Sequence, residues 1–205
     1  MWIDAHAHLA DCTDNQLSAV VGQATADGVR CIVNTATDIP SAQTVIRQCA
    51  LHQGLYAAVG ILPFDVEGLD GMWDTALERL CDERAVVAIG EIGLDATNPR
   101  YPSLEKQMPV FIRQIEIARD RGLAAVIHSR GAVKAAIDTC VRCNLRKAVF
   151  HCYTESLENL QSLLDNGYYV SFSGIITFAK NPLVPLVKYA PLDRILIETD
   201  TPYLA

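Results

Sequence analysis

The sequence of 205 residues lacks the features that mark several protein classes. It has no apolar run of about 18 residues, so it predicts no membrane-spanning helix. With only 12 Gly, 9 Pro and 20% charged residues, it is neither collagen-like nor disordered. Residues 1–15 carry acidic groups where a signal peptide needs a basic start and an apolar centre, so we expect a cytoplasmic protein. The seven Cys, an odd number in such a chain, favour reduced thiols over a disulfide framework.

The chain also lacks an excess of basic residues. It has 17 Lys and Arg against 24 Asp and Glu, which gives a formal net charge of −7. Such a charge provides no long-range attraction for nucleic acid or an anionic membrane, although a local cationic site can override it. Half of the residues are hydrophobic. The length and composition favour one domain over residues 1–205 with a packed core.

Short β-branched segments alternate with segments of helical periodicity along the whole chain. The predicted strands cover residues 2–9, 31–36, 56–62, 86–92, 124–128, 148–152, 168–172 and 195–198. The predicted helices cover residues 15–27, 40–53, 70–82, 103–121, 130–143, 155–166 and 180–190. Strict alternation requires parallel strands, which leaves an open doubly wound sheet or a closed barrel. Eight strands, and no Gly-x-Gly-x-x-Gly or Walker-type loop, favour an α/β fold of the TIM type, a (β/α)8 barrel.

The eighth predicted strand is followed by too few residues for a helix. The sequence ends at Ala205, five residues beyond Asp200. We therefore expect a barrel that lacks the final helix, and we interpret the chain as truncated at its C-terminus. The uncovered flank of the first and last strands would expose apolar surface, which predicts self-association.

Six residues with metal-binding side chains fall at the ends of predicted strands. They are His6, His8, Glu91, His128, His151 and Asp200, and the remaining histidine, His52, falls within a predicted helix. His6 and His8 share a face of their strand because they are two residues apart. In a parallel barrel the carboxyl ends of the strands converge on one face. Imidazoles and carboxylates that converge there predict a site for one divalent cation, or for two bridged by Glu91.

Several neighbouring polar residues have two open interpretations. Arg130 can bind a phosphate through its planar guanidinium, or it can be a solvated residue near a helix start. Asp95, Ser129 and Thr199 can orient the metal ligands, or they can cap the next helix or turn.

Longer motifs carry a family resemblance. They read Ile-Asp-Ala-His-Ala-His-Leu, Gly-Glu-Ile-Gly-Leu-Asp, Ile-His-Ser-Arg, Phe-His-Cys-Tyr-Thr, Ser-Phe-Ser-Gly-Ile and Ile-Glu-Thr-Asp-Thr-Pro-Tyr-Leu, between residues 2 and 204. In these motifs the chain resembles the TatD family of metal-dependent hydrolases. The resemblance implies a cytoplasmic barrel hydrolase, with deoxyribonucleases that act as exonucleases on DNA ends among its relatives. It further implies that His6, His8, Glu91 and Asp200 hold one metal, and that Glu91, His128 and His151 hold the second.

Two cations a few ångströms apart activate a water and neutralise charge on a scissile phosphate. His, Glu and Asp ligands do not select sharply among Mg²⁺, Mn²⁺ and Zn²⁺. Glu91 and Asp200 are the predicted catalytic residues, with Asp200 either the general base or a ligand only. DNA ends are the expected substrate, and Arg130 the expected phosphate contact.

One motif departs from the family pattern in the substrate region. The family commonly shows Gly-Ile-His-Pro-His after the third strand, whereas this chain has Leu62 and Phe64 in place of the two histidines. The apolar replacements favour a less charged substrate, so hydrolysis of another ester or amide, such as an aminoacyl ester, stays an alternative. The second alternative is a truncated barrel that retains the metal-binding residues but does not catalyse a reaction.

Overall fold

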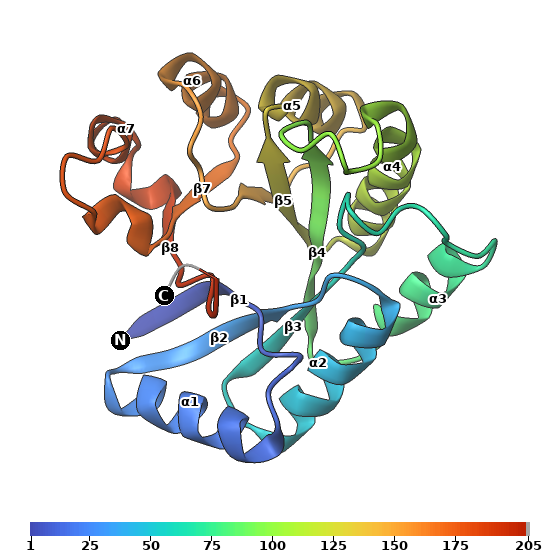
Figure 1. The fold of residues 1–205 in the computed structure, drawn as a ribbon, viewed down its shortest axis with the longest axis vertical. Coiled ribbons are helices and arrows are strands. Elements are labelled where there is room, and N and C mark those ends of the chain that lie inside the picture. Colours follow the sequence, from blue (N-terminus) through green and yellow to red (C-terminus); the bar gives the residue numbers. More distant parts are fainter. Residues whose placement is uncertain (204–205) are drawn as a thin grey trace.

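The computed structural model describes residues 1–203 and forms an eight-stranded parallel barrel (Figure 1). The strands are β1 (Trp2–Ala7), β2 (Val29–Thr35), β3 (Leu55–Val59), β4 (Val86–Asp95), β5 (Ala124–Arg130), β6 (Ala148–Phe150), β7 (Tyr169–Phe172) and β8 (Ile195–Ile197). The α-helices are α1 (Asp14–Ala26), α2 (Ile39–Leu51), α3 (Trp73–Leu80), α4 (Leu104–Arg121), α5 (Val133–Arg142), α6 (Leu157–Asp165) and α7 (Val184–Tyr189). Each strand pairs in parallel with the next one in sequence, from β1 to β8. The predicted TIM-type barrel is therefore confirmed.

β1 and β8 meet at a seam that closes the barrel. Unlike the other strand pairs, the two strands are joined there partly by side-chain hydrogen bonds. The Asp4 carboxylate accepts hydrogen bonds from the backbone N–H and the hydroxyl of Thr199, at 3.0 and 2.6 Å. Near the carboxyl ends of the two strands, the backbone N–H of Asp200 donates to the carbonyl of His6 at 2.9 Å. Side chains thus supply part of the bonding that a backbone ladder provides elsewhere.

Local sequence signals explain where the helices begin. Thr13 and Gln16 form a capping box at the start of α1, and Asp38 and Ser41 form one at the start of α2. These side chains satisfy backbone N–H groups that have no partner within the helix. Pro185 lies in the first turn of α7, where its missing N–H removes no hydrogen bond.

Some predicted boundaries were wrong by several residues. The predicted helix 180–190 shortens to α7, because a helix that places Pro185 in its first turn cannot begin four residues earlier. A 3-10 helix (Gly174–Thr177) precedes it, and a second one (Leu192–Arg194) precedes β8. β1 ends at Ala7, so His8 follows the strand, whereas β4 continues to Asp95. Within residues 1–203 no helix follows β8, as the sequence predicts.

The main core lies between the barrel and its ring of helices, and it includes Phe111, Ile115, Phe150 and Tyr168. In the part of the chain that the structure describes, no helix is long and apolar enough to cross a bilayer.

An apolar cavity of about 520 Å³, which we call the basal cavity, includes the amino ends of β1, β4 and β5. Its lining residues are Met1, Trp2, Ile3, Ala5, Val33, Val87, Ala88, Ala124, Val126, Val149, Leu192, Ile195, Leu196 and Ile197. Trp2 is 59% exposed and Leu192 91% exposed. Large apolar side chains therefore meet solvent at this end of the barrel.

Candidate metal centre

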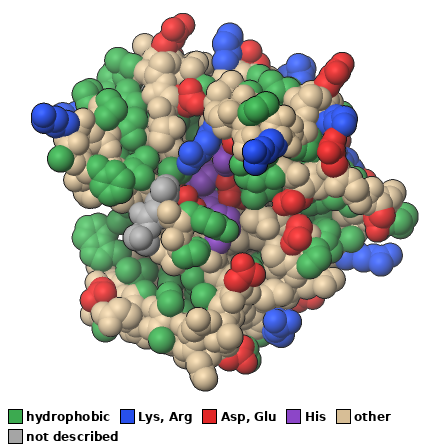
Figure 2. Space-filling model, viewed as in Figure 1, with side chains coloured by type: hydrophobic (Ala, Val, Ile, Leu, Met, Phe, Trp, Pro, Cys, Tyr) green, Lys and Arg blue, Asp and Glu red, His purple; other side chains and the backbone are tan. Residues whose placement is uncertain are grey.

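A second cavity, of about 560 Å³, opens at the carboxyl ends of the strands, and we call it the mouth. Its lining residues are His8, Thr37, Leu62, Phe64, Asp65, Glu91, Asp95, Thr97, Tyr101, His128, Arg130, His151, Asp200 and Tyr203. Figure 2 shows histidine side chains at the centre of this face, set back among acidic and hydrophobic groups. The mouth thus brings together five of the six predicted metal ligands, and the sixth, His6, is buried directly beneath its histidines.

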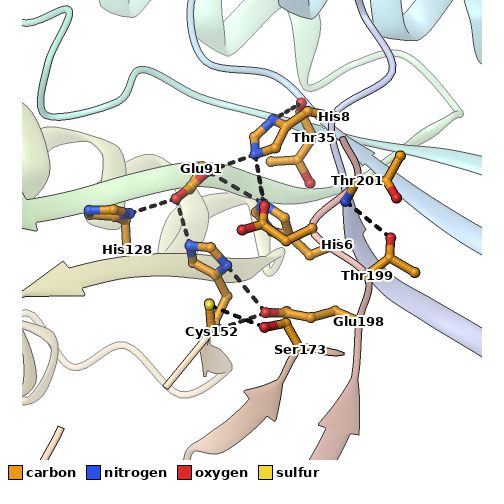
Figure 3. A network of polar contacts seen from close by, with 12 residues as sticks. His6, His8, Thr35, Glu91, His128, Cys152, Ser173, Glu198, Thr199 and Thr201 are labelled. Atoms are coloured by element: carbon orange, nitrogen blue, oxygen red, sulfur yellow. Dashed lines mark hydrogen bonds and ion pairs between the residues drawn. The ribbon is translucent and has the colours of Figure 1, made fainter. Parts of the chain in front are cut away.

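Glu91 lies at the centre of the cluster, with one carboxylate oxygen toward each of two pairs of histidines (Figure 3). Its Oε1 is 2.8 Å from His128 Nδ1 and 2.6 Å from His151 Nε2. Its Oε2 is 3.4 Å from His6 Nε2 and 3.2 Å from His8 Nε2. This is the arrangement of a carboxylate that is able to bridge two cations.

Asp200 lies beside His6 and His8, the two histidines that face Glu91 Oε2. Its Oδ1 is 3.7 Å from His6 Nε2 and 3.6 Å from His8 Nε2. Three overlapping groups each place their ligand atoms within 4.8 Å of one another. These groups are His6, His8 and Glu91; His6, His151 and Asp200; and Glu91, His128 and His151.

The hydrogen bonds around the histidines test whether a cation fits. His8 Nδ1 lies 3.0 Å from the carbonyl of Thr35, which only accepts, so His8 Nε2 is left with a lone pair when the ring is neutral. That lone pair faces His6 Nε2 at 2.9 Å. His6 Nδ1 is buried and has no hydrogen-bond partner within residues 1–203. Ring nitrogens that face each other beside two carboxylates are the donor set of a divalent metal site.

The half of the cluster around Glu91 Oε1 also places a ring nitrogen close to a carboxylate oxygen. His128 Nε2 is 2.9 Å from the Asp95 carboxylate, so in the neutral ring this nitrogen donates and His128 Nδ1 is left as the acceptor. That acceptor nitrogen lies 2.8 Å from Glu91 Oε1, which also only accepts when ionised. Two acceptors at this distance fit a cation that lies to one side and is bound by both. The residues present therefore fit a metal in both halves.

Burial and neighbouring charges shift the pKa values of these groups. Burial by itself raises the pKa of Glu91, but the charge of His151 and the ring of His128 outweigh it and hold the pKa well below its ordinary value. Despite burial, Asp95 and Glu91 raise the pKa of His128, and Glu91 and Glu198 raise the pKa of His151, so these two rings hold protons that a bound cation would displace. Burial lowers the pKa of His6, which favours the neutral ring that a metal ligand needs. Burial raises the pKa of Asp200, so its carboxylate is poorly solvated.

Some polar residues that hold the ligands in place were not singled out by the sequence. Glu198 accepts hydrogen bonds from the backbone N–H of Cys152 at 2.7 Å and from the hydroxyl of Ser171 at 2.5 Å, and its carboxylate lies 3.6 Å from His151 Nδ1. Asp4 accepts from the backbone N–H of His6. A buried acidic residue within an apolar strand was the available signal for both.

Of the residues expected to orient ligands or cap helices, Asp95 contacts a ligand directly, as described above. Thr199 contacts Asp4 in the seam and no ligand. No side-chain hydrogen bond of Ser129 to a ligand is present among residues 1–203. Asp95 is thus the one that can fix a histidine ring.

Gly93 allows β4 and β5 to approach closely between Glu91 and His128. Its φ is 150°, and a Cβ added there would lie 1.8 Å from the carbonyl oxygen of His128. Only a residue without a side chain fits at this point. The close approach keeps the Glu91 carboxylate within hydrogen-bond distance of the His128 ring.

Arg130 is the last residue of β5 and lines the mouth. Its Nη2 is 3.8 Å from the Cys152 sulfur, and it forms no ion pair with a carboxylate in residues 1–203. Leu62 and Phe64 line the same cavity. The guanidinium is thus placed near the cluster without an anionic partner.

An eight-stranded parallel barrel with histidines and carboxylates gathered at its carboxyl end is typical of metal-dependent hydrolases. Comparison with known proteins agrees. The model of the family described as TatD related DNase matches residues 3–205. The chain belongs to the TatD family.

Some relatives are named only as metal-dependent hydrolases, and others are named as exonucleases. The uncharacterized metal-dependent hydrolase YabD of Bacillus subtilis is 36% identical, across 100% of this chain and 81% of its own. The 3'-5' ssDNA/RNA exonuclease TatD of Salmonella typhimurium is 30% identical, across 90% of this chain and 72% of its own. The crystal structure of YjjV, a TatD homologue from Escherichia coli K12, has a TM-score of 0.92 and 28% identity, across 99% of this chain and 80% of its own. This chain is accordingly a metal-dependent hydrolase of the TatD family.

Leu204, the last residue of the final family motif, lies outside the described residues.

Proposed function

We propose that this protein hydrolyses phosphodiester bonds at the ends of DNA strands with the help of two divalent cations. His6, His8, Glu91 and Asp200 would hold one cation, and Glu91, His128 and His151 the other. Mg²⁺, Mn²⁺ and Zn²⁺ all suit this mixture of nitrogen and oxygen ligands. The exonuclease name of the Salmonella relative supports a nucleic acid substrate.

The observation that carries the proposal is the position of Glu91. Its two carboxylate oxygens face different histidine pairs, and the residue is only 3% exposed. A buried carboxylate surrounded by four imidazoles is expensive to desolvate unless positive charge compensates it. Two cations provide that charge and explain why the four histidines turn ring nitrogens toward the same carboxylate.

When bound, the two cations supply Lewis acidity that favours deprotonation of water and offsets negative charge on the phosphate. Asp200 accepts the proton, because its Oδ1 lies at the edge of the cluster and the residue lines the mouth where a water enters. As metal ligands the histidines would be neutral, and the Asp95 carboxylate holds the His128 ring in one orientation. Arg130 binds a phosphate oxygen through its guanidinium.

The first experiment measures metal content by elemental analysis of a monodisperse preparation, beside a Glu91→Gln variant. We expect two equivalents in the wild type and a loss of both in the variant, because an amide provides only one neutral oxygen donor. Asp82→Asn, an exposed change of carboxylate to amide, is the matched control and should retain both. A folded wild type without bound metal would sink this mechanism.

The second experiment offers the metal-loaded protein a panel of substrates at one metal concentration. Single-stranded and double-stranded oligonucleotides test the nuclease, and an aminoacyl ester and a lactone test the alternative that Leu62 and Phe64 favour. The fold does not decide between these bonds, since a β-aspartyl dipeptidase from Fervidobacterium islandicum shares it with a TM-score of 0.62 and 13% identity. Hydrolysis of the esters alone would replace the nuclease proposal.

A further inference from the structure

An aromatic pair forms one wall of the mouth. Phe64 follows β3 and Tyr101 precedes α4, and their ring centroids lie 4.0 Å apart with an interplanar angle of 28°. Phe64 also meets the His128 ring in an edge contact, with centroids 5.5 Å apart at 84°. We call Phe64 and Tyr101 the aromatic wall. It fixes a stacked pair of rings directly beside a proposed metal ligand.

Part of the aromatic wall is accessible from the mouth. Stacking on Phe64 uses one face of the Tyr101 ring, and both residues line the cavity and are only partly buried. Leu62 extends the apolar surface of the mouth. A flat unsaturated ring is the ligand group that gains most from such a surface, because every nucleobase has a π face that stacks on an aromatic side chain.

Apart from the proposed cations, the mouth offers little positive charge for the phosphates of a long strand. Arg130 is the only Lys or Arg among the described residues that line the cavity, whereas four lining residues are acidic: Asp65, Glu91, Asp95 and Asp200. A protein that tracks a long single strand provides a cationic groove with repeated stacking positions. The mouth has one arginine and one stacked pair, and its volume of about 560 Å³ suits a small molecule rather than a strand.

We propose that the mouth recognises a single terminal nucleotide, with its base stacked on the aromatic wall and one phosphate oxygen bound by Arg130. This inference rests on the proposed phosphodiester hydrolysis and specifies what the site reads. The enzyme then requires a base at the end it attacks and tolerates any identity of that base. It gains little from the rest of the strand.

Equilibrium binding tests the wall without turnover. The probes are thymidine 5'-monophosphate and deoxyribose 5-phosphate, which share the sugar phosphate and differ in the base. We expect the wild type to bind the nucleotide at least about 10-fold more tightly, a typical effect of stacking one base. Tyr101→Ala should remove that preference, Tyr101→Phe should retain it, and Tyr189→Ala, an exposed tyrosine on α7, is the matched control. Equal binding of the two probes by the wild type would overturn the inference.

Kinetics on oligonucleotides test the same point in the working enzyme. Substrates carry either a normal or an abasic nucleotide at one terminus. For the wild type, kcat/KM should fall by about 10-fold at the abasic end. The Tyr101→Ala variant should hydrolyse both substrates at the rate that the wild type shows on the abasic one. An undiminished preference in Tyr101→Ala contradicts a role for the wall.

Substrate length tests the single-nucleotide limit. A dinucleotide and a 20-residue strand should give kcat/KM values within about three-fold of each other, because one arginine contact adds little dependence on distant phosphates. If kcat/KM is more than about 10-fold lower for the dinucleotide than for the 20-residue strand, the enzyme has an extended binding groove and the inference is overturned. If no oligonucleotide is hydrolysed at all, the proposed function fails, whereas hydrolysis without preference for a terminal base overturns this inference alone.

Discussion

The carboxyl end of the barrel buries polar side chains, whereas the amino end exposes apolar ones. At the carboxyl end, His6 is fully buried and Glu91 is 3% exposed, so charged and polar groups are withdrawn from water. At the amino end, large apolar residues such as Trp2 and Leu192 stand in solvent around the basal cavity. Each end contradicts the usual preference of polar groups for the surface and apolar groups for the interior.

The difference between the two ends indicates which end serves function. A buried polar cluster destabilises the fold unless a ligand compensates it, so its presence at the mouth indicates a site that is built for binding. Exposed apolar side chains at the base provide no chemistry, but they offer a surface for association. Changes at the mouth should therefore alter activity strongly, and changes at the base should alter association.

The largest expected effect is the loss of turnover in Asp200→Asn. Removing a general base lowers kcat by about 100-fold to 10,000-fold. The metal-free variant should nevertheless unfold at a higher temperature than the metal-free wild type near neutral pH, because burial raises the pKa of Asp200 and makes its ionised form unfavourable in the fold. Steady-state kinetics and thermal unfolding check both, with the exposed Asp193→Asn as control. A variant with normal kcat would remove Asp200 from the mechanism.

The next effect tests the close packing that places the ligands. Gly93→Ala should lower the free energy of unfolding by about 3 kcal/mol, since the new methyl group meets the His128 carbonyl. Gly22→Ala is the matched control, because Gly22 lies in α1 with open space around it. That variant should be about 0.5–1 kcal/mol more stable than the wild type. Urea unfolding measures both, and similar values for the two variants would contradict the steric argument.

Metal removal should have a smaller effect on stability. A ligand at about 100 times its Kd stabilises the folded state by about 2.7 kcal/mol, so chelation should lower the Tm by the corresponding amount. The Glu91→Gln variant should show no such response, because it lacks the bridging carboxylate. A Tm that does not depend on metal in the wild type would mean that the cluster does not bind a cation in the folded protein.

The smallest change in stability is expected at the base. Leu192→Ser should alter the free energy of unfolding by less than about 0.5 kcal/mol, because the side chain is 91% exposed. The predicted self-association uses the uncovered flank of β1 and β8, both of which contribute residues to the basal cavity, so sedimentation at increasing concentration should show less dimer for this variant. Leu77→Ala, a change in the core, should instead lower the free energy of unfolding by about 2–5 kcal/mol. A wild type that stays monomeric throughout would contradict the association.

The sequence predicted the strand order and the meeting of the six candidate ligands because both follow from local patterns and one topological rule. Strand ends are recognisable from β-branched runs, and parallel strands bring those ends to one face. The stacking of Phe64 on Tyr101 was not predictable in this way, since Tyr101 lies in a loop without periodicity. The same holds for Asp4 and Thr199, whose pairing depends on the exact register at the seam.

The seam between β1 and β8 also determines when the metal site comes into existence. His6 and Asp200 are joined by a backbone hydrogen bond across almost the whole sequence. During synthesis the nascent chain holds His6 from the start, but the ligand set stays incomplete until Asp200 has left the ribosome. Contacts of such long sequence separation also form late, because closing a long loop has a high entropic cost. If Asp200 completes the site as we propose, hydrolytic activity would be absent from every partly made or partly folded chain and would begin only when the barrel closes.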